Sequence, residues 1–298
     1  MKNVPSFKQL QYLIALYDHQ HFGQAATACF VSQSTLSASI TNLEATLGAQ
    51  LLERDHKTFL FTPLGEEIVQ RSRLIIDQCA ALSDYAKTQG KPLQGKFYLG
   101  IIPTIAPFIL NELQTVCQQH YPDLSLYIRE DTTDNVLRSL REGKLDLVIL
   151  ALPYPMGDFF VRILCKDYFQ LVLPKTWQDK PMEQLPANSI FLLEKEHCLT
   201  GHALQACHLR DSKKINPFFA TSLHTLIQMV SHQPGMTYLP TLAINSGLLA
   251  GTDLMAIPLQ DDEAFREIGV AWRNTSYKTE SYNILSTIIK KIITPLCP

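Results

Sequence analysis

The stretch that decides the fold is residues 7–68, FKQLQYLIALYDHQHFGQAATACFVSQSTLSASITNLEATLGAQLLERDHKTFLFTPLGEEI. From Phe7 to Tyr17 its apolar residues recur at three- and four-residue steps, which predicts an amphipathic helix. A short alanine-rich helix is expected from Gln24 to Cys29. Ser32 is then a candidate N-cap and Gly48 a stop signal for a third helix. The residues expected to form the buried stripe of this third helix are Leu36, Ile40, Leu43 and Leu47.

The outer face of the third helix carries polar side chains of the kind that contact DNA. In a helix-turn-helix the second helix of the motif enters the major groove, where glutamine can pair with adenine and hydroxyls can meet bases or phosphates. An ordinary solvated helix would show the same polar face, so periodicity alone leaves both interpretations open. The candidate DNA-contacting residues are Ser32, Gln33, Ser34, Thr35, Ser37 and Thr41.

Residues 51–61 alternate charged and apolar side chains, which predicts a two-stranded wing. Thr62 and Pro63 then mark the start of a long helix that extends to about Gln89. Its apolar seam is narrow enough to pack against a partner helix, so we expect a dimer contact there. The seam consists of Leu64, Ile68, Ile75, Cys79 and Leu82.

After a break at residues 89–92 the pattern changes to alternating strands and helices. Such alternation indicates an α/β domain with a parallel sheet. A second unit of the same kind is expected from about Cys165 to Phe265. The expected elements of the first unit are strands at 96–102, 124–130 and 146–152, helices at 106–120 and up to Gly143, a returning strand at 268–273 and a last helix at 281–293.

Composition sets limits but does not identify a function. The 298 residues suffice for two or three domains, and 46% hydrophobic with 18% charged residues suits a globular protein. No apolar run approaches the roughly 18 residues of a membrane span, and the opening residues lack a secretory signal, so we expect a cytoplasmic protein without membrane contact. The seven cysteines are odd in number and dispersed, so we expect no disulfide framework and expect most of them to be buried thiols.

Charge alone gives no sign of a nucleic-acid partner. The net charge is −2, and residues 1–60 are formally neutral. Because phosphate neutralisation supplies much of DNA affinity, several copies on one site are needed for useful binding. The charged residues of this segment are Lys2, Lys8, Arg54 and Lys57 against Asp18, Glu44, Glu53 and Asp55.

Residues 7–68 resemble the winged helix-turn-helix of the LysR family of bacterial transcription regulators. The resemblance implies an α/β protein with a two-lobed effector domain like the periplasmic binding proteins, and it places Arg54, His56 and Lys57 in the wing near the phosphates. It further implies a DNA-binding activator rather than an enzyme, with no cofactor, which forms a homodimer or homotetramer on double-stranded promoter DNA and works with RNA polymerase. The implied boundaries are a DNA-binding domain at 1–62, a linker and dimerisation helix at 63–90, and an effector domain at 91–298, with lobe I at 91–164 plus 267–298 and lobe II at 165–266.

Residues 192–210, LLEKEHCLTGHALQACHLR, with FFATSLHTLIQMV following, resemble the redox segment of peroxide-sensing members of this family. The match implies that Cys198 is the peroxidatic thiol, that Cys207 is the resolving one, and that their reversible disulfide controls oxidative-stress genes. Hydrogen peroxide and a cellular thiol reductant are then partners. The residues that the match places around the reacting thiol are Thr104, Thr133, His197 and Arg266.

Chemistry gives separate reasons for this composition. Peroxide is attacked by thiolate, which cationic neighbours favour, and the leaving hydroxide needs a hydrogen-bond donor. The histidines could also be exposed loop residues, and Thr104 could merely cap the following helix. If residues 203–210 are helical, nine residues of helix span roughly 13 Å, whereas a disulfide needs Cα atoms within about 7 Å. Oxidation would then have to unwind the segment. The nearby cationic candidates are Lys195, His197, His202, His208 and Arg210.

Three other interpretations stay open. A metal sensor would use the soft ligands of this segment, although the Cys198–Cys207 spacing fits no common zinc pattern. A regulator with a small organic acid between its lobes would leave the cysteines incidental. A thiol peroxidase would consume peroxide catalytically, against which the DNA-binding motif argues. The ligands that a metal would take are His197, Cys198, His202, Cys207 and His208.

Overall fold

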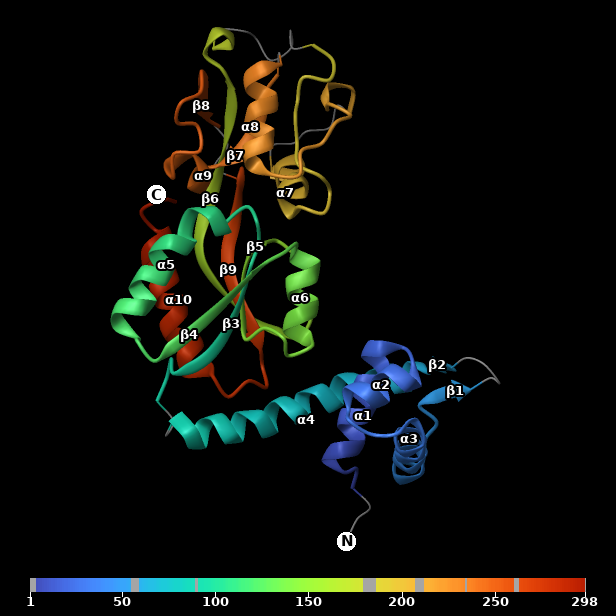
Figure 1. Cartoon of the computed structure of the whole chain (residues 1–298). Helices are drawn as coiled ribbons and strands as arrows, with labels where there is room; N and C mark the ends of the chain where they lie inside the picture. Colours follow the sequence, from blue (N-terminus) through green and yellow to red (C-terminus); the bar gives the residue numbers. More distant parts are fainter. Residues whose placement is uncertain are drawn as a thin grey trace. The chain divides into compact units, whose positions relative to one another are not determined.

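The chain divides into two compact units, which the computed structural model in Figure 1 shows coloured along the sequence. The first comprises Met1–Lys91 with Arg141–Gly143, and the second Pro92–Leu140 with Lys144–Pro298. The residues that the structure describes are 4–54, 59–88, 91–178, 186–206, 212–233, 235–259 and 263–297.

The first unit opens with the three expected helices, α1 (Phe7–His19), α2 (Phe22–Ala28) and α3 (Gln33–Leu47). The predicted signals for α3 are confirmed, because the Ser32 hydroxyl accepts from the Thr35 amide and Gly48 ends the helix with φ 65°. Helix α2 begins two residues before the expected start. The reason is an unusual N-cap, since His21 Nδ1 accepts from the amides of Gly23 and Gln24.

These helices pack around a core to which α3 contributes Leu36, Ile40 and Leu43, all fully buried. The expected fourth member of this stripe is wrong, because the Leu47 side chain is 37% exposed. It lies in the last turn of α3, directly before Gly48 turns the chain away. Three of the four predicted positions therefore carry the packing of α3.

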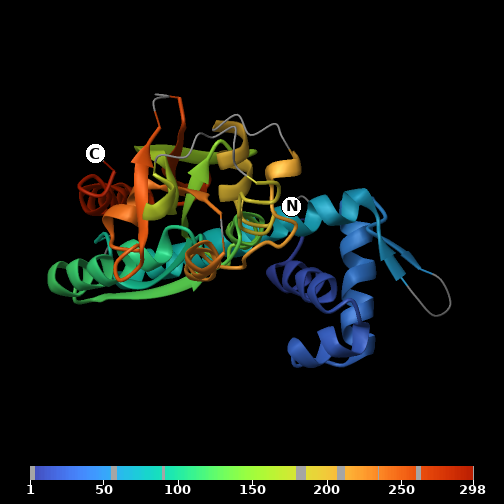
Figure 2. The same cartoon turned by 90° about the horizontal axis from the view of Figure 1, so that it is seen from above.

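The wing consists of β1 (Leu52–Arg54) and β2 (Phe59–Phe61), paired antiparallel as expected. Edge-to-face contacts of Phe61 with Tyr17 and of Phe59 with Phe22 attach it to the helices. In Figure 2 the two strands, in light blue, stand to one side of these helices. The expected phosphate contacts His56 and Lys57 lie outside the described residues.

Helix α4 (Pro63–Thr88) starts at the predicted signal, since the Thr62 hydroxyl accepts from the Gly65 amide. Its first turn lies against the segment that leads into the wing, where a Cβ added at Gly65 would be 2.2 Å from the Leu51 carbonyl oxygen. Most of the predicted apolar seam is exposed in the single chain, and Leu82 reaches 71%. Of the predicted seam residues, only Ile68 packs against the core of the unit.

The second unit is built on a mixed seven-stranded sheet, with strand order β4-β3-β5-β9-β6-β7 and β8 paired with β6. The expected parallel sheet is correct for β3, β4 and β5 alone, because β9 runs antiparallel to β5 and β6, and β7 and β8 run antiparallel to β6. Apolar runs of this kind indicate burial but do not encode strand direction. The elements are β3 (Gly95–Ile101), α5 (Ala106–His120), β4 (Leu124–Glu130), α6 (Thr133–Arg141), β5 (Leu147–Leu152), β6 (Phe159–Pro174), η1 (Lys175–Trp177), α7 (Cys198–Ala206), η3 (Ser212–Lys214), α8 (Leu223–His232), β7 (Thr237–Pro240), α9 (Thr241–Asn245), β8 (Leu254–Pro258), β9 (Phe265–Arg273) and α10 (Thr279–Ile293).

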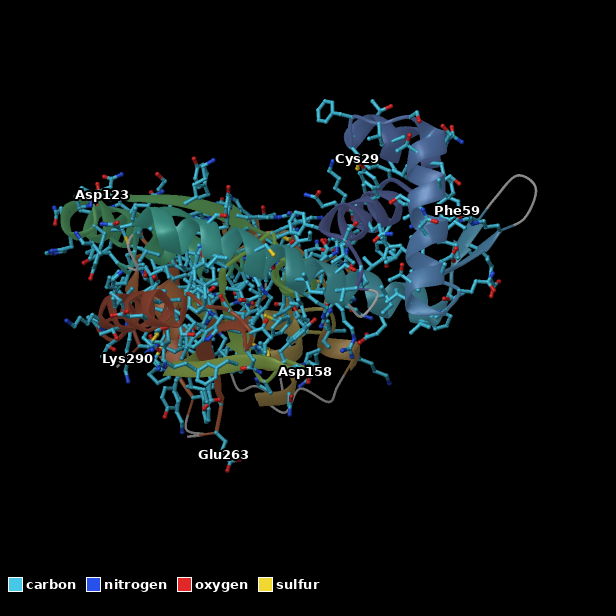
Figure 3. The ribbon with its side chains drawn as sticks, turned by 90° about the horizontal axis from the view of Figure 1, so that it is seen from below. Cys29, Phe59, Asp123, Asp158, Glu263 and Lys290 are labelled. Carbon is cyan, nitrogen blue, oxygen red and sulfur yellow. The ribbon has the colours of Figure 1, made fainter. Side chains whose placement is uncertain are left out.

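Two hydrophobic clusters lie along this sheet, and the long strand β6 contributes to both, through Leu164 in one and Phe169 in the other. The first includes α5 and α10, which pack side by side (Figure 1), and the second includes α7 and α8. Figure 3 marks the surface of this unit with Asp123 after α5 and Lys290 on α10. The lobe boundaries themselves stay a prediction. Among the described helices, none is both long and apolar enough to cross a membrane.

Candidate functional site

Cys198 is the first residue of α7, and it lies in a small pocket where three chain segments meet. The first segment follows β3, the second leads into the start of α6, and the third leads into the start of α7. The pocket therefore brings Thr104, Thr133 and His197 to the half-buried Cys198, as the sequence resemblance implied. The full lining is Ile102, Pro103, Thr104, Thr132, Thr133, Glu196, His197 and Cys198.

The electrostatics of Cys198 differ from the cationic surroundings that the local sequence predicts. Burial raises the pKa of the Cys198 thiol, while a hydrogen bond with Thr133 and the charge of Arg266 act to lower it. Burial outweighs both, so the pKa stays above its ordinary value and the resting side chain is a thiol. Within the described residues, the cation whose charge acts on Cys198 is Arg266, which is distant from it in sequence.

Arg266, on β9, is 0% exposed and fully engaged. Its Nε donates to Asp167 Oδ2 at 3.0 Å, and its Nη1 and Nη2 donate to Thr104 Oγ1 at 2.8 Å and to the Thr104 carbonyl at 3.2 Å. Asp167, also 0% exposed, accepts in addition from the Leu242 amide. A buried ion pair persists only when its remaining polar atoms are satisfied, as they are here. This network fixes the guanidinium beside the Cys198 pocket.

Thr104 was expected either to serve the pocket or to cap the following helix. The structure excludes the cap, because α5 has Ile105 as its N-cap residue and no side-chain capping bond. The Thr104 hydroxyl instead accepts from Arg266 and lines the pocket of Cys198. Its own proton therefore stays available for a donor bond toward a bound molecule.

His202 is not the exposed loop residue that the sequence allowed, because only 6% of it is exposed. Its Nε2 lies 2.9 Å from the Pro153 carbonyl, and its Nδ1 is buried without a hydrogen-bond partner. Burial lowers the pKa of the imidazole, and the charge of Arg266 adds to this, whereas the Pro153 bond opposes it. His202 is therefore neutral near pH 7, and it is not one of the cations expected around the thiol.

Cys207, His208 and Arg210 lie outside the described residues, so the pairing of Cys198 with Cys207 stays a prediction. Helix α7 is described as far as Ala206. Among the described cysteines none is in a disulfide. Cys117 and Cys297 are buried and Cys79 is exposed on α4, whereas Cys29, Cys165 and Cys198 are half-buried. Of the described side chains, no three of the His, Cys, Asp and Glu type are grouped as a metal would require.

The candidate DNA face is formed by α3 and the adjoining wing. Gln33, Ser34, Thr35 and Thr41 are exposed, whereas Ser37 is half-buried. The Ser32 hydroxyl is committed to the cap of α3. Arg54 Nη2 lies 3.3 Å from Thr41 Oγ1 and 3.4 Å from Glu44 Oε2. Glu44 also accepts from the amides of Leu51 and Leu52, so it ties the wing to the helix that carries the polar face.

Sequence reasoning missed a second cavity of about 270 Å³ that adjoins the Cys198 pocket. The two share Pro103, Thr104 and His197. The N-terminal end of α8 contributes a cluster of polar groups to it, and such an end favours anions. Its lining is Pro103, Thr104, Pro107, Phe108, Glu130, Leu193, His197, Thr221, Ser222, Leu223 and His224.

Comparisons with known proteins cover the whole chain. The model of "Bacterial regulatory helix-turn-helix protein, lysR family" matches residues 7–66, and that of "LysR substrate binding domain" matches residues 90–291. The transcriptional regulator EstR of Acinetobacter baylyi is 36% identical over 302 residues, covering 99% of this chain and 100% of the relative. A hydrogen peroxide-inducible genes activator of Escherichia coli O6:H1 is 34% identical over 290 residues, covering 96% of this chain and 95% of the relative. The reduced regulatory domain of OxyR2 from Vibrio vulnificus is 44% identical, with a TM-score of 0.65, covering 68% of this chain and 97% of the relative.

Proposed function

Because the chain belongs to the LysR family of bacterial helix-turn-helix transcription regulators, we propose that it senses hydrogen peroxide through Cys198 and controls oxidative-stress promoters. The observation that carries the proposal is the pocket that joins Cys198 to the hydroxyls of Thr104 and Thr133 beside the buried Arg266. The peroxide-inducible activator of Escherichia coli and the OxyR2 domain, both similar to this chain, support it.

The pocket suits the chemistry that peroxide reduction needs. The Cys198 sulfur attacks the proximal oxygen, the O–O bond breaks, and the distal oxygen leaves with a proton as water, so that the thiol becomes a sulfenic acid. The hydroxyl of Thr104 can donate to a peroxide oxygen, the hydrogen bond from Thr133 favours the thiolate, and the charge of Arg266 favours the negative charge that develops. Cys207 then attacks the sulfenic sulfur, a second water leaves and a disulfide remains, which a cellular thiol reductant reverses.

The disulfide changes the regulator because it is incompatible with the reduced helix. Cys198 starts α7, which continues to Ala206. Cys207 follows Ala206 in the sequence. A disulfide between Cys198 and Cys207 requires this helix to unwind, because nine residues of helix separate the two Cα atoms by more than a disulfide can span. We propose that the altered segment changes how effector domains pair in a homodimer or homotetramer, and that α3 and the wing then meet promoter DNA with altered spacing and engage RNA polymerase.

The test is peptide mapping of disulfides in the protein after treatment with one equivalent of hydrogen peroxide. We expect one new bridge, Cys198–Cys207, and loss of the transcriptional response in Cys198→Ser. The matched control is Cys79→Ser, because Cys79 is an exposed thiol on α4 far from the pocket in sequence. A full response to peroxide from Cys198→Ser would refute the proposal.

A regulator of a small organic effector is the second candidate, and the 270 Å³ cavity beside His197 and His224 favours it. EstR, which is similar to this chain, is described as a transcriptional regulator without mention of peroxide. This function predicts that a panel of small carboxylic acids raises the melting temperature of the reduced protein, and that Cys198→Ser responds to them unchanged. A response to peroxide alone would eliminate it.

A further inference from the structure

Two cysteines outside the Cys198 pocket contact each other in the second unit. Cys165 lies on β6 and is half-buried, and Cys297 lies after the end of α10 and is buried. Both side chains pack in the hydrophobic cluster that includes α5 and α10, and a hydrogen bond joins the two thiols. The proposed function uses neither of them.

Hydrogen bonds of the surrounding segments hold Cys297 at β6. Helices α9 and α10 both pack against this strand (Figure 1). On α9 the Leu242 amide donates to Asp167 Oδ1 at 2.9 Å, and one turn later Asn245 Nδ2 donates to the Leu296 carbonyl at 3.1 Å. A single turn of α9 therefore joins the Asp167 side chain to the residue that precedes Cys297.

The electrostatics of Cys297 agree with this placement. Cys165 and Asp167 are two residues apart on β6, so their side chains lie on the same face of the strand. The hydrogen bond with Cys165 and burial raise the pKa of the Cys297 thiol, and the charge of Asp167 raises it further. The charge of Arg266 acts in the opposite direction. Cys297 is therefore protonated at rest, and a thiol is a slow nucleophile.

Two thiols in contact can be joined with little rearrangement. The S–S bond is about 2 Å long, so hydrogen-bonded sulfurs need to approach by only about 1–2 Å. Cys297 lies outside helix and strand, because α10 ends at Ile293, so this movement disrupts no regular element. Among the described side chains, no third His, Cys, Asp or Glu is grouped with this pair as a metal site would require.

We infer that Cys165 and Cys297 are a second redox pair, which excess hydrogen peroxide converts into a disulfide that ties the segment after α10 to β6. The sulfur of Cys165, the more exposed residue, attacks one peroxide oxygen, the O–O bond breaks, and the other oxygen leaves with the thiol proton as water. The sulfur of Cys297 then attacks the sulfenic sulfur, and the displaced hydroxide takes the Cys297 proton and leaves as a second water. One peroxide is reduced and two thiols are oxidised.

This disulfide differs from the proposed Cys198–Cys207 bridge in its structural effect. It joins segments that are far apart in sequence but already in contact, so it stabilises the folded unit and unwinds no helix. It closes beside Asp167, whose bond to Arg266 helps to fix the Cys198 pocket. The inference does not depend on peroxide sensing by Cys198.

The experiment treats the full-length Cys198→Ser, Cys207→Ser protein with excess hydrogen peroxide, so that the proposed sensing bridge cannot form. Disulfides are then identified by peptide mapping, and the melting temperature is measured before and after oxidation. The test variant adds Cys165→Ser. The matched control adds Cys117→Ser, which removes a buried thiol of the same cluster, whose pKa burial raises to about 11.

We expect a cross-linked peptide that contains Cys165 and Cys297, and a rise of about 5 °C or more in the melting temperature on oxidation. A dithiol reductant should reverse both changes. The Cys117→Ser control should show the same cross-link and the same rise. The Cys165→Ser variant should show neither, and because each protein is compared with its own reduced form, any destabilisation by the substitution itself does not enter the result.

Two outcomes overturn the inference. One is the recovery of Cys165 as a free thiol or a sulfinic acid after excess peroxide, because a neighbouring thiol would have captured the sulfenic acid. The other is a disulfide from Cys165 or Cys297 to a different cysteine. Either result leaves peroxide sensing by Cys198 untouched, since the tested chain lacks that residue.

Discussion

Replacing Asp167 by Asn tests how the pocket is held, because it removes one charge of the buried pair and keeps the shape. Arg266 would retain its two bonds to Thr104 but lose its carboxylate partner at 3.0 Å. Removing one partner of a buried ion pair costs about 3–5 kcal/mol, since the other charge stays buried and uncompensated. For a unit of this size that lowers the melting temperature by about 6–20 °C.

The assay is calorimetric unfolding of the full chain, with Asp158→Asn as the control. Asp158 is an exposed carboxylate between β5 and β6 (Figure 3), so its replacement should leave the melting temperature within about 1 °C. Asp167→Leu combined with Arg266→Met should recover much of the loss, because an apolar pair can replace a buried ion pair at little cost. If Asp167→Asn melts like the wild type, the ion pair does not hold the pocket.

Four further predictions concern the DNA face, the thiol, the seam of α4 and the redox segment. Gln33→Ala should weaken specific DNA binding by about 1–3 kcal/mol in fluorescence anisotropy; unchanged affinity and unchanged specificity in the variant would exclude direct readout by Gln33. Thr133→Val should raise the pKa of Cys198 further, because the hydrogen bond that lowers it is lost; thiolate absorbance against pH measures this, and an unchanged titration contradicts it. Leu82→Glu should shift the protein toward monomer in sedimentation, since the exposed seam would carry a charge; an unaltered distribution excludes this seam as the dimer contact. Hydrogen exchange should show lost protection within residues 196–212 on oxidation, and identical protection in both redox forms would argue against unwinding.

Local signals in the sequence were sufficient to predict most helices and strands. They did not predict the direction of every strand or the contacts between distant segments. Ser32 and Gly48 mark α3 correctly because capping is a contact between residues close in sequence. His21 caps α2 although histidine is not among the usual N-cap residues, so the start of that helix was missed. The antiparallel course of β9 could not be predicted, since pairing of Gly269 with Leu150 and Ile163 is set by the fold as a whole.

The site shows the same division between local and distant information. Thr104, Thr133 and Arg266 entered only through resemblance, because no local pattern indicates that side chains 162 residues apart will share a hydrogen bond. The burial of His202 was unpredictable for a similar reason. Its neighbours in sequence are small or polar, and its environment is made by Pro153 and Arg266 from other segments.

Because Gly65 has no side chain, α4 packs directly against the helix-turn-helix, and the two move together. The backbone of the first turn of α4 lies directly on Leu51, so the helix has no hinge at its base. Its 26 residues form a helix roughly 39 Å long. A turn of roughly 10° about one end displaces the other by roughly 7 Å, which is two base-pair steps at 3.4 Å each. Under the proposed function, the helix-turn-helix would therefore reach a new position on DNA without any change in its own fold, and a residue larger than glycine at position 65 would alter that movement.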